Sequence, residues 1–227
     1  MIKKFIIFIC LLFCINNLTI TSLAENNIYR KVSNQNMKIA LTFDDGPHPG
    51  RTPEILNVLN KFNVKATFFL IGQNIEYYPE TFKKIISEGH EIGNHTFSHK
   101  PLNKCSDDTL KTEIESFDKV VSEFNCKKTS IIRPPGGLYN DALKKYATEN
   151  DYSIVLWSID TMDWSHKSVD DIVDNILLNT NSGDIILMHD FISGQSSTPK
   201  ALEIVIPILL ERGFEFVTVS ELIKKSA

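Results

Sequence analysis

Two adjacent carboxylates, Asp44 and Asp45, follow an apolar run that is typical of a β-strand, and a Gly-Pro pair follows them. Folding alone gives little reason for this placement, because neighbouring carboxylates repel each other and aspartate is a poor strand former. Side chains at successive positions of a strand end point in different directions, so one carboxylate can bind a metal ion while the other acts as a base. The alternative is that Asp-Asp-Gly-Pro is only a polar turn.

Two histidines, His95 and His99, have the spacing of a metal-binding pair. If this segment begins a helix, the two imidazoles lie on one face and can bind one ion. With Asp45 they supply two nitrogens and one carboxylate oxygen and leave a position for water, which is the ligand set of a catalytic zinc site. The same ligands describe the facial triad of non-haem iron oxygenases. The His-x-Asp/Glu spacing common in those triads is absent from this sequence.

An arginine and a further histidine end two other apolar runs. Arg133 follows Ile131-Ile132 and precedes two prolines. A charged residue there indicates a buried partner, and the guanidinium group suits a carboxylate, although a surface arginine before a proline turn is the alternative. His189 ends the run 185–189. Such a histidine is usually a core residue satisfied by hydrogen bonds, but its place at a strand end supports a role as general acid.

Two carboxylates and two indoles cluster between Trp157 and Trp164. Asp160 and Asp163 with these indoles could form a sugar-binding wall, whereas Trp157 taken alone is interpreted as a core residue. The three remaining histidines are interpreted as solvated or structural, and they are His48, His90 and His166.

Short β-type runs alternate with amphipathic helical stretches along most of the chain. The runs are residues 39–43, 66–70, 91–94, 130–133, 153–157, 185–189 and 215–219. Strands that alternate with helices predict βαβ units and a parallel sheet covered by helices. Seven such units fit a closed or nearly closed barrel, in which reactive residues gather where the strands end. Chemically suitable groups follow five of these strands, which favours a functional site over chance.

Four positions have the pattern of helix starts. Thr52-Pro53 and Thr198-Pro199 each predict an N-cap followed by proline at the first helical position. Ser106 and Ser168 are followed by acidic residues and predict two further N-caps.

The first 24 residues have the pattern of a secretory signal. Lys3 and Lys4 precede an apolar run, and Ser22-Leu23-Ala24 provides small residues for cleavage. The run is short for a membrane span, so a cleaved signal is favoured over an anchor. Residues 25–36 are polar and predict a flexible lead-in to a single domain, residues 37–227.

The charge of the chain argues against two classes of partner. The full sequence has 24 basic and 28 acidic residues, and removal of residues 1–24 takes away two lysines, which changes the net charge from −4 to −6. No basic cluster remains for nucleic acid or an anionic membrane surface. Cys105 and Cys126 are left in the mature chain, and they either pair or remain free thiols.

Five segments of the sequence together resemble the ordered motifs of a known family. TFDDGP, HTFSH, RPPGG, DTMDW and LMHD are similar to the motifs of the NodB-type polysaccharide deacetylases, carbohydrate esterase family 4. The resemblance spans residues 38–222. It implies an α/β fold, a distorted (β/α)7 barrel with the active site at the C-terminal ends of the strands. It also implies metal-dependent hydrolysis of N-acetyl groups on a glycan.

The resemblance implies a role for each of four residues in catalysis. Asp44 would be the catalytic base, and Arg133 would hold it in place. His189 would be the general acid, and Asp163 would orient it and keep it charged.

The resemblance also implies a metal site. Asp45, His95 and His99 would bind a divalent ion, for which Zn²⁺ is expected and Co²⁺ or another divalent ion is an alternative.

The pocket for the acetyl group would be formed by Gly136, Trp164 and Leu187. Trp164 and Leu187 would wall the space for the methyl group. The family often has an aromatic residue after the two prolines, where this chain has Gly136. A glycine keeps the backbone N–H that would meet the oxyanion but loses an aromatic wall, which predicts a wider groove or an altered sugar preference.

We therefore expect a secreted, cell-wall-associated, monomeric hydrolase that removes N-acetyl groups from an N-acetylglucosamine polymer, above all peptidoglycan. The alternatives are an O-acetyl esterase or a chitooligosaccharide deacetylase of the same fold, or a glycan-binding protein without catalysis. Whether N-acetylglucosamine or N-acetylmuramic acid is the target does not follow from the motifs.

Overall fold

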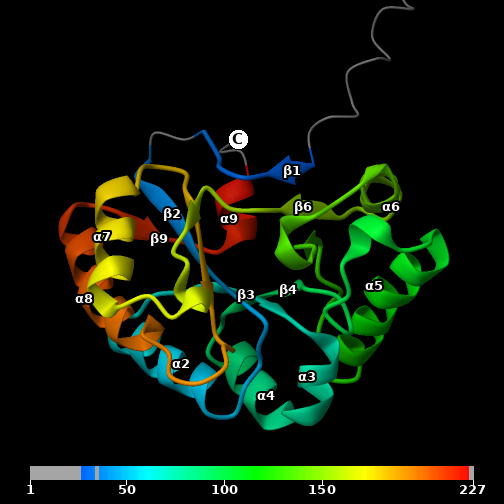
Figure 1. The fold of residues 1–227 in the computed structure, drawn as a ribbon, viewed down its shortest axis with the longest axis horizontal. Coiled ribbons are helices and arrows are strands. Elements are labelled where there is room, and N and C mark those ends of the chain that lie inside the picture. Colours follow the sequence, from blue (N-terminus) through cyan, green and yellow to red (C-terminus); the bar gives the residue numbers. More distant parts are fainter. Residues whose placement is uncertain (1–26, 34–35, 225–227) are drawn as a thin grey trace, which may run out of the picture.

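The computed structural model describes residues 27–33 and 36–224, and within them the strands form one curled sheet with helices around its outside (Figure 1). The strand order is β1-β6-β5-β4-β3-β2-β8-β7, with β9 beside β2, and the paired strands are all parallel. The strands are β1 (Ile28–Tyr29), β2 (Lys38–Asp44), β3 (Thr67–Leu70), β4 (Glu91–Asn94), β5 (Ile131–Ile132), β6 (Ser153–Val155), β7 (Ile159–Asp160), β8 (Ile185–His189) and β9 (Glu215–Phe216).

Helices lie between most of the strands and cover the convex face of the sheet (Figure 1). The α-helices are α2 (Arg51–Lys61), α3 (Gly72–Tyr77), α4 (Pro79–Ser87), α5 (Asp107–Ser122), α6 (Asp141–Glu149), α7 (Val169–Asn179), α8 (Thr198–Glu211) and α9 (Val219–Ile223). Three short 3₁₀ turns are η1 (Leu102–Lys104), η2 (Pro135–Gly137) and η3 (Asp163–Ser165). The predicted parallel α/β barrel is confirmed in this distorted form, in which β1 and β7 are the two ends of the strand order.

The strands are buried on both faces, and each face has its own partners. Along β2, Ile39, Leu41 and Phe43 belong to the apolar cluster that includes the buried residues of α2 and α8. Ala40 belongs to a second cluster inside the barrel. Because successive side chains of a strand alternate between faces, Thr42 and Asp44 point to the same side as Ala40.

The floor of the barrel is formed by apolar residues from five strands, and they are Ala40, Phe69, Ile131, Val155 and Ile185. Arg133 lies two positions after Ile131, just beyond β5, and His189 lies four positions after Ile185 on β8, so both are on the same faces as these apolar residues. The alternation of the strands therefore places polar residues above an apolar floor, at the carboxyl ends.

All seven expected strands are present, and two short strands are additional. β1 lies in the segment that the sequence analysis predicted to be a flexible lead-in, and this part of the prediction is wrong for Ile28 and Tyr29. They pair with Ile154 and Val155 of β6. Lys31 then forms a salt bridge of 2.7 Å with the buried Asp184. Pairing with an exposed strand edge orders this segment despite its polar composition.

Two of the four predicted N-caps are confirmed. Ser106 accepts a hydrogen bond from the backbone N–H of Thr109 at the start of α5, and Ser168 forms a capping box with Asp171 at the start of α7. Thr52 and Thr198 are not caps, because α2 begins one residue before Thr52 and α8 begins at Thr198 itself.

The cysteines and the hydrophobicity of the helices bear on three further predictions. Cys105 and Cys126 are both free thiols. The described part of the chain contains no helix of the length and hydrophobicity needed to cross a membrane. The expected signal peptide lies outside the described residues, and the domain boundary at residue 37 and the monomeric state remain predictions.

Candidate active site

The polar residues at the strand ends meet in one cavity of about 280 Å³. Its lining residues are Asp44, Asp45, His95, His99, Gly136, Trp157, Asp160, Trp164, Leu187 and His189. Parallel pairing places Asp44 of β2 directly opposite His189 of β8, because all strands end at the same rim. Eight of the ten residues that the sequence analysis proposed for the site line this cavity. Arg133 and Asp163 lie behind it.

Arg133 is completely buried behind Asp44. Its Nη1 donates to Asp44 Oδ1 at 2.6 Å and to Thr42 Oγ1 at 2.9 Å. Nε and Nη2 donate to the carbonyl oxygens of Val155 and Leu156. The guanidinium group thus fixes one oxygen of Asp44 and leaves Oδ2 facing the cavity residues, 3.7 Å from His95 Nε2. This is the arrangement that the role of Arg133 as holder of Asp44 requires.

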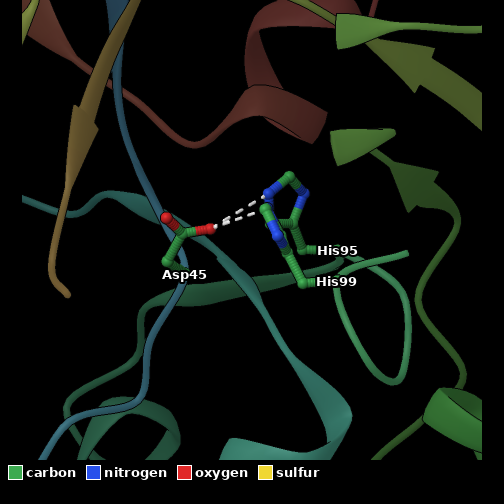
Figure 2. A group of neighbouring side chains, drawn as sticks. All are labelled: Asp45, His95 and His99. Atoms are coloured by element: carbon green, nitrogen blue, oxygen red, sulfur yellow. Dashed lines mark ion pairs between the residues drawn. The ribbon is translucent and has the colours of Figure 1, made fainter. Parts of the chain in front are cut away.

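Asp45, His95 and His99 converge on one point (Figure 2). Asp45 Oδ1 lies 3.3 Å from His95 Nε2 and 3.2 Å from His99 Nε2. The ligand atoms of a tetrahedral zinc site with bonds of about 2.0–2.1 Å are separated by about 3.3 Å. Within the described residues, Asp45 Oδ1 is a buried oxygen without a hydrogen-bond partner.

The hydrogen bonds of His95 indicate what this point attracts. His95 Nδ1 lies 2.7 Å from the carbonyl oxygen of Arg133 and must donate to it, since a carbonyl only accepts. Neutral His95 therefore presents the lone pair of Nε2 to the carboxylate of Asp45. Two electron-rich atoms face each other stably only when a positive charge lies between them, so the donor set fits a divalent cation.

The pKa shifts of Asp45 and His95 also favour a positive charge between their side chains. Burial raises the pKa of Asp45, but the imidazoles of His95 and His99 outweigh burial and hold it well below its usual range. Burial lowers the pKa of His95, but the charges of Asp44 and Asp45 outweigh it and raise the pKa above its usual value. Both shifts show that the negative charges of Asp44 and Asp45 favour a positive charge beside the imidazoles.

The segment that carries the two histidines is a loop. The helix start, which was the condition for placing both imidazoles on one face, is not formed. Thr96 and His99 have left-handed backbone angles, with φ of 71° and 58°. The backbone N–H of Thr96 donates to Asn94 Oδ1. The N–H and hydroxyl of Ser98 both donate to the buried carboxylate of Glu113, at 2.8 and 2.6 Å. These contacts from β4 and α5 shape a loop in which both imidazoles point the same way.

His189 is paired with the buried carboxylate of Asp163. Its Nδ1 donates to Asp163 Oδ1 at 2.8 Å, which directs Nε2 away from Asp163. Burial lowers the pKa of His189, but the hydrogen bond and charge of Asp163 outweigh it and raise the pKa to about 9. An imidazolium at neutral pH is therefore available beside the cavity.

The residues expected to contact the acetyl group surround the remaining wall. Leu187 is buried on β8, and Trp164 is about half exposed at 50%. Gly136 has a φ of 64°, in the left-handed region that glycine adopts without strain. The space beside it is open, because a Cβ built there approaches only Leu138, at 3.8 Å. Trp157, interpreted as core, also lines the cavity.

Asp190 is a buried residue whose contribution the sequence analysis did not assign. Its Oδ1 accepts from the backbone N–H of Gly46 at 2.8 Å, and its Oδ2 accepts from the hydroxyl of Thr52 at 2.7 Å. Burial raises the pKa of Asp190 to about 7. Gly46 is necessary here, since a Cβ would lie 2.0 Å from Asp190 Oδ2. Asp190 thus shapes the turn that presents Asp45.

The remaining histidines have the structural or solvated positions that the sequence analysis gave them. His48 Nδ1 accepts from the backbone N–H groups of Gly50 and Arg51 at the start of α2. His90 is buried and accepts from the N–H of Ala66, and His166 is exposed.

Comparison with known proteins agrees with the fold and the site. Residues 31–155 match the family described as polysaccharide deacetylase. A peptidoglycan-N-acetylglucosamine deacetylase of Bacillus cereus is 42% identical over 196 residues, which cover 86% of this chain and 92% of that protein.

Two solved structures extend the comparison. The peptidoglycan N-acetylglucosamine deacetylase Bc1960 in complex with 4-naphthalen-1-yl-N-oxidanyl-benzamide aligns with a TM-score of 0.85 and 39% identity, over 88% of this chain and 94% of that one. A family 4 acetyl xylan esterase from Clostridium thermocellum in complex with a cobalt ion has a TM-score of 0.75 and 32% identity, over 82% and 89% of the two chains. From its five motifs, its fold and these relatives, the chain belongs to the polysaccharide deacetylase family, whose members are hydrolases.

Proposed function

We propose that this protein is a secreted, zinc-dependent amidase that removes acetyl groups from N-acetylglucosamine units of peptidoglycan. The observation that carries the proposal is the convergence of a carboxylate base, a three-residue metal site and a histidine acid on one cavity. The peptidoglycan-N-acetylglucosamine deacetylase of Bacillus cereus, which is similar over 92% of its length, supports the choice of substrate.

Asp45, His95 and His99 are the residues that would hold the metal ion. When bound, a divalent cation supplies a Lewis acid that polarises the acetyl carbonyl and acidifies water. Two histidines and one carboxylate favour zinc among the common biological cations, and their number leaves a position open for water and substrate.

Asp44 acts as the general base in this proposal. One of its oxygens is held by Arg133, and Oδ2 is left to take the proton of the water that attacks the acetyl carbon. The attack forms a C–O bond and moves the carbonyl π electrons onto the oxygen. The backbone N–H of Gly136, which lines the cavity, would donate to this oxyanion in the proposal.

His189 acts as the general acid. Its Nε2 proton passes to the amide nitrogen as the C–N bond breaks, so that an amine and acetate leave. Asp163 keeps the imidazolium charged and oriented through Nδ1. Trp164 and Leu187 enclose the methyl group, and the absence of a side chain at Gly136 leaves a wider entrance for a substituted sugar.

Mass spectrometry of purified muropeptides and chitooligosaccharides tests the proposal. Each substrate is incubated with the zinc-loaded protein, with and without a chelator. Loss of one acetyl group from the N-acetylglucosamine of a muropeptide, abolished by the chelator, is expected. Loss only from N-acetylmuramic acid, from chitooligosaccharides or from an O-acetylated glycan would replace the proposed substrate, and binding without acetate release would overturn the enzymatic role.

His99→Ala is expected to lower metal affinity by more than about 100-fold, since losing even a residue that only supports a ligand typically costs 10- to 100-fold. The side chain of His99 is 45% exposed, so its removal should leave the fold intact. Titration with Co²⁺, followed by its absorption spectrum, measures the change. His166→Ala removes an exposed histidine outside the site and should bind Co²⁺ as the unaltered protein does. Equal affinities of the two variants would contradict the ligand assignment.

The pH profile should have a basic limb set by His189. The protonated form is the active acid, so kcat/KM falls as pH rises through the pKa of His189. That pKa is raised to about 9 by Asp163, and a bound cation should return part of this shift toward the ordinary 6.5. Asp163→Asn is expected to move the limb to lower pH as well as to reduce the rate. A limb that stays in place would mean that another group is the acid.

A further inference from the structure

Both threonine-proline pairs of the sequence place a buried hydroxyl on a buried carboxylate. Thr52 and Thr198 are fully buried, and neither caps its helix. Thr52 Oγ1 donates to Asp190 Oδ2, and Thr198 Oγ1 donates to Asp163 Oδ2, each at 2.7 Å. The second of these contacts reaches the residue that holds the general acid.

The carboxylate of Asp163 accepts four hydrogen bonds. Oδ1 accepts from His189 Nδ1 at 2.8 Å and from the backbone N–H of Trp164 at 2.9 Å. Oδ2 accepts from the backbone N–H of His189 at 2.8 Å and from the hydroxyl of Thr198. An ionised carboxylate has about four lone-pair positions, so this set fills them. Besides His189 itself, Thr198 provides the only side-chain donor of the four.

The orientation of an aspartate carboxylate depends on such contacts. Its terminal torsion has no sharp staggered minima, so hydrogen bonds decide how the group is turned. The backbone donors of Trp164 and His189 belong to the same β7–β8 region as the pair they support. Thr198 belongs to α8, 35 residues beyond Asp163, and ties this helix to the carboxylate.

We propose that Thr198 is a positioning residue for proton transfer: its hydroxyl holds Asp163 Oδ2 so that Oδ1 stays on His189 Nδ1 and His189 Nε2 stays directed at the leaving nitrogen. The inference rests on the proposed function of His189 as the general acid. It predicts that Thr198 matters only for the step in which a poor leaving group must be protonated. Attack on the acetyl carbon and metal binding do not depend on it.

The test compares two acetyl substrates with different leaving groups. In an N-acetylglucosamine oligomer the leaving group is an amine, which must be protonated by His189. In 4-nitrophenyl acetate the leaving group is 4-nitrophenolate, which is stable without a proton. In the zinc-loaded full chain, Thr198→Val should lower kcat for the oligomer by about 10- to 100-fold, a part of the effect typical of general acid catalysis. KM for the oligomer, the rate with 4-nitrophenyl acetate and Co²⁺ affinity should not change. Thr198→Ser, which keeps the hydroxyl, should restore kcat.

A matched control separates this role from the loss of a buried hydrogen bond as such. Thr129 is also a buried threonine, and it precedes β5, at the end of the strands opposite to the cavity. Its hydroxyl donates to the carbonyl oxygen of Ile92 in β4. Thr129→Val should leave both rates unchanged. If Thr198→Val lowers both rates equally, or neither, the positioning role is wrong. Thr198→Ala provides the same comparison with a smaller side chain, should Thr198→Val not fold.

A measurement without turnover distinguishes this inference from the proposed function. In the metal-free protein, the proton on His189 Nδ1 should give a downfield NMR signal because it is hydrogen-bonded to Asp163. The signal should shift or broaden in Thr198→Val and persist in Thr198→Ser. An unchanged signal in Thr198→Val would overturn the positioning role even if the protein is an active deacetylase. If the signal changes in Thr198→Val but the unaltered protein deacetylates no glycan, the proposed function is wrong, while the effect of Thr198 on the Asp163–His189 pair still holds.

Discussion

Asp44→Asn is expected to reduce turnover of an N-acetylated glycan by about 10²- to 10⁴-fold, the usual contribution of a general base. Asparagine has the shape of aspartate and keeps an oxygen that can accept from Arg133 Nη1. Its amide group cannot take a proton from water. The proposed ligands Asp45, His95 and His99 are unchanged in this variant, and the hydrogen bond that orients His95 goes to the carbonyl oxygen of Arg133, not to Asp44. Metal affinity should therefore change little while turnover is lost.

Acetate release and Co²⁺ titration measure the two quantities on the same preparation. Asp184→Asn is a suitable control, because Asp184 is also a buried carboxylate but lies at the start of β8, away from the cavity. It should weaken the fold through Lys31 without a comparable loss of turnover. Near-normal turnover by metal-loaded Asp44→Asn would show that the base is another group.

Arg133→Met is expected to lower the free energy of unfolding by about 3–5 kcal/mol, the range found when one partner of a buried ion pair is removed. The substitution leaves the carboxylate of Asp44 buried without its partner. It also removes the donors of the carbonyl oxygens of Val155 and Leu156. Urea unfolding measures the change, and Arg212→Met, at an exposed arginine, should cost less than about 1 kcal/mol.

A double variant separates the two causes of this loss. Asp44→Leu combined with Arg133→Met removes both charges and should recover part of the stability, because an apolar pair of similar volume avoids the desolvation of two ions. It should not recover any activity. If the double variant is less stable than Arg133→Met alone, the hydrogen bonds of Arg133 to β6 matter more than its charge.

The three residues of the candidate metal site could be brought together from the sequence because their signal is local. Asp45 follows a strand, His95 follows another, and parallel strands end at one rim. The conformation of the histidine loop could not be predicted, because the contacts of Ser98 with Glu113 that shape it come from a helix 15 residues away. The spacing of His95 and His99 suits a helix and this loop equally well.

Thr198 and β1 show the limit of local patterns more clearly. A threonine before proline has the same sequence signature whether its hydroxyl caps its own helix or binds a distant carboxylate, and here Asp163 is the acceptor. β1 has only two residues, too few for any alternation to be visible, and it exists because β6 offers an unpaired edge. Both features depend on the assembled barrel.

The two faces of β2 make the strand intolerant of insertions and deletions. Odd-numbered residues from Ile39 to Phe43 pack against helices, and even-numbered residues from Ala40 to Asp44 line the barrel interior. Loss of a single residue from this strand would exchange the two rows, so that a carboxylate faced the helices and phenylalanine faced the cavity. The fold therefore tolerates substitutions in β2 but not insertions or deletions. Substitutions at the odd positions, which are fully buried, must keep an apolar side chain of similar volume, while those at Thr42 and Asp44 change the residues that contact Arg133.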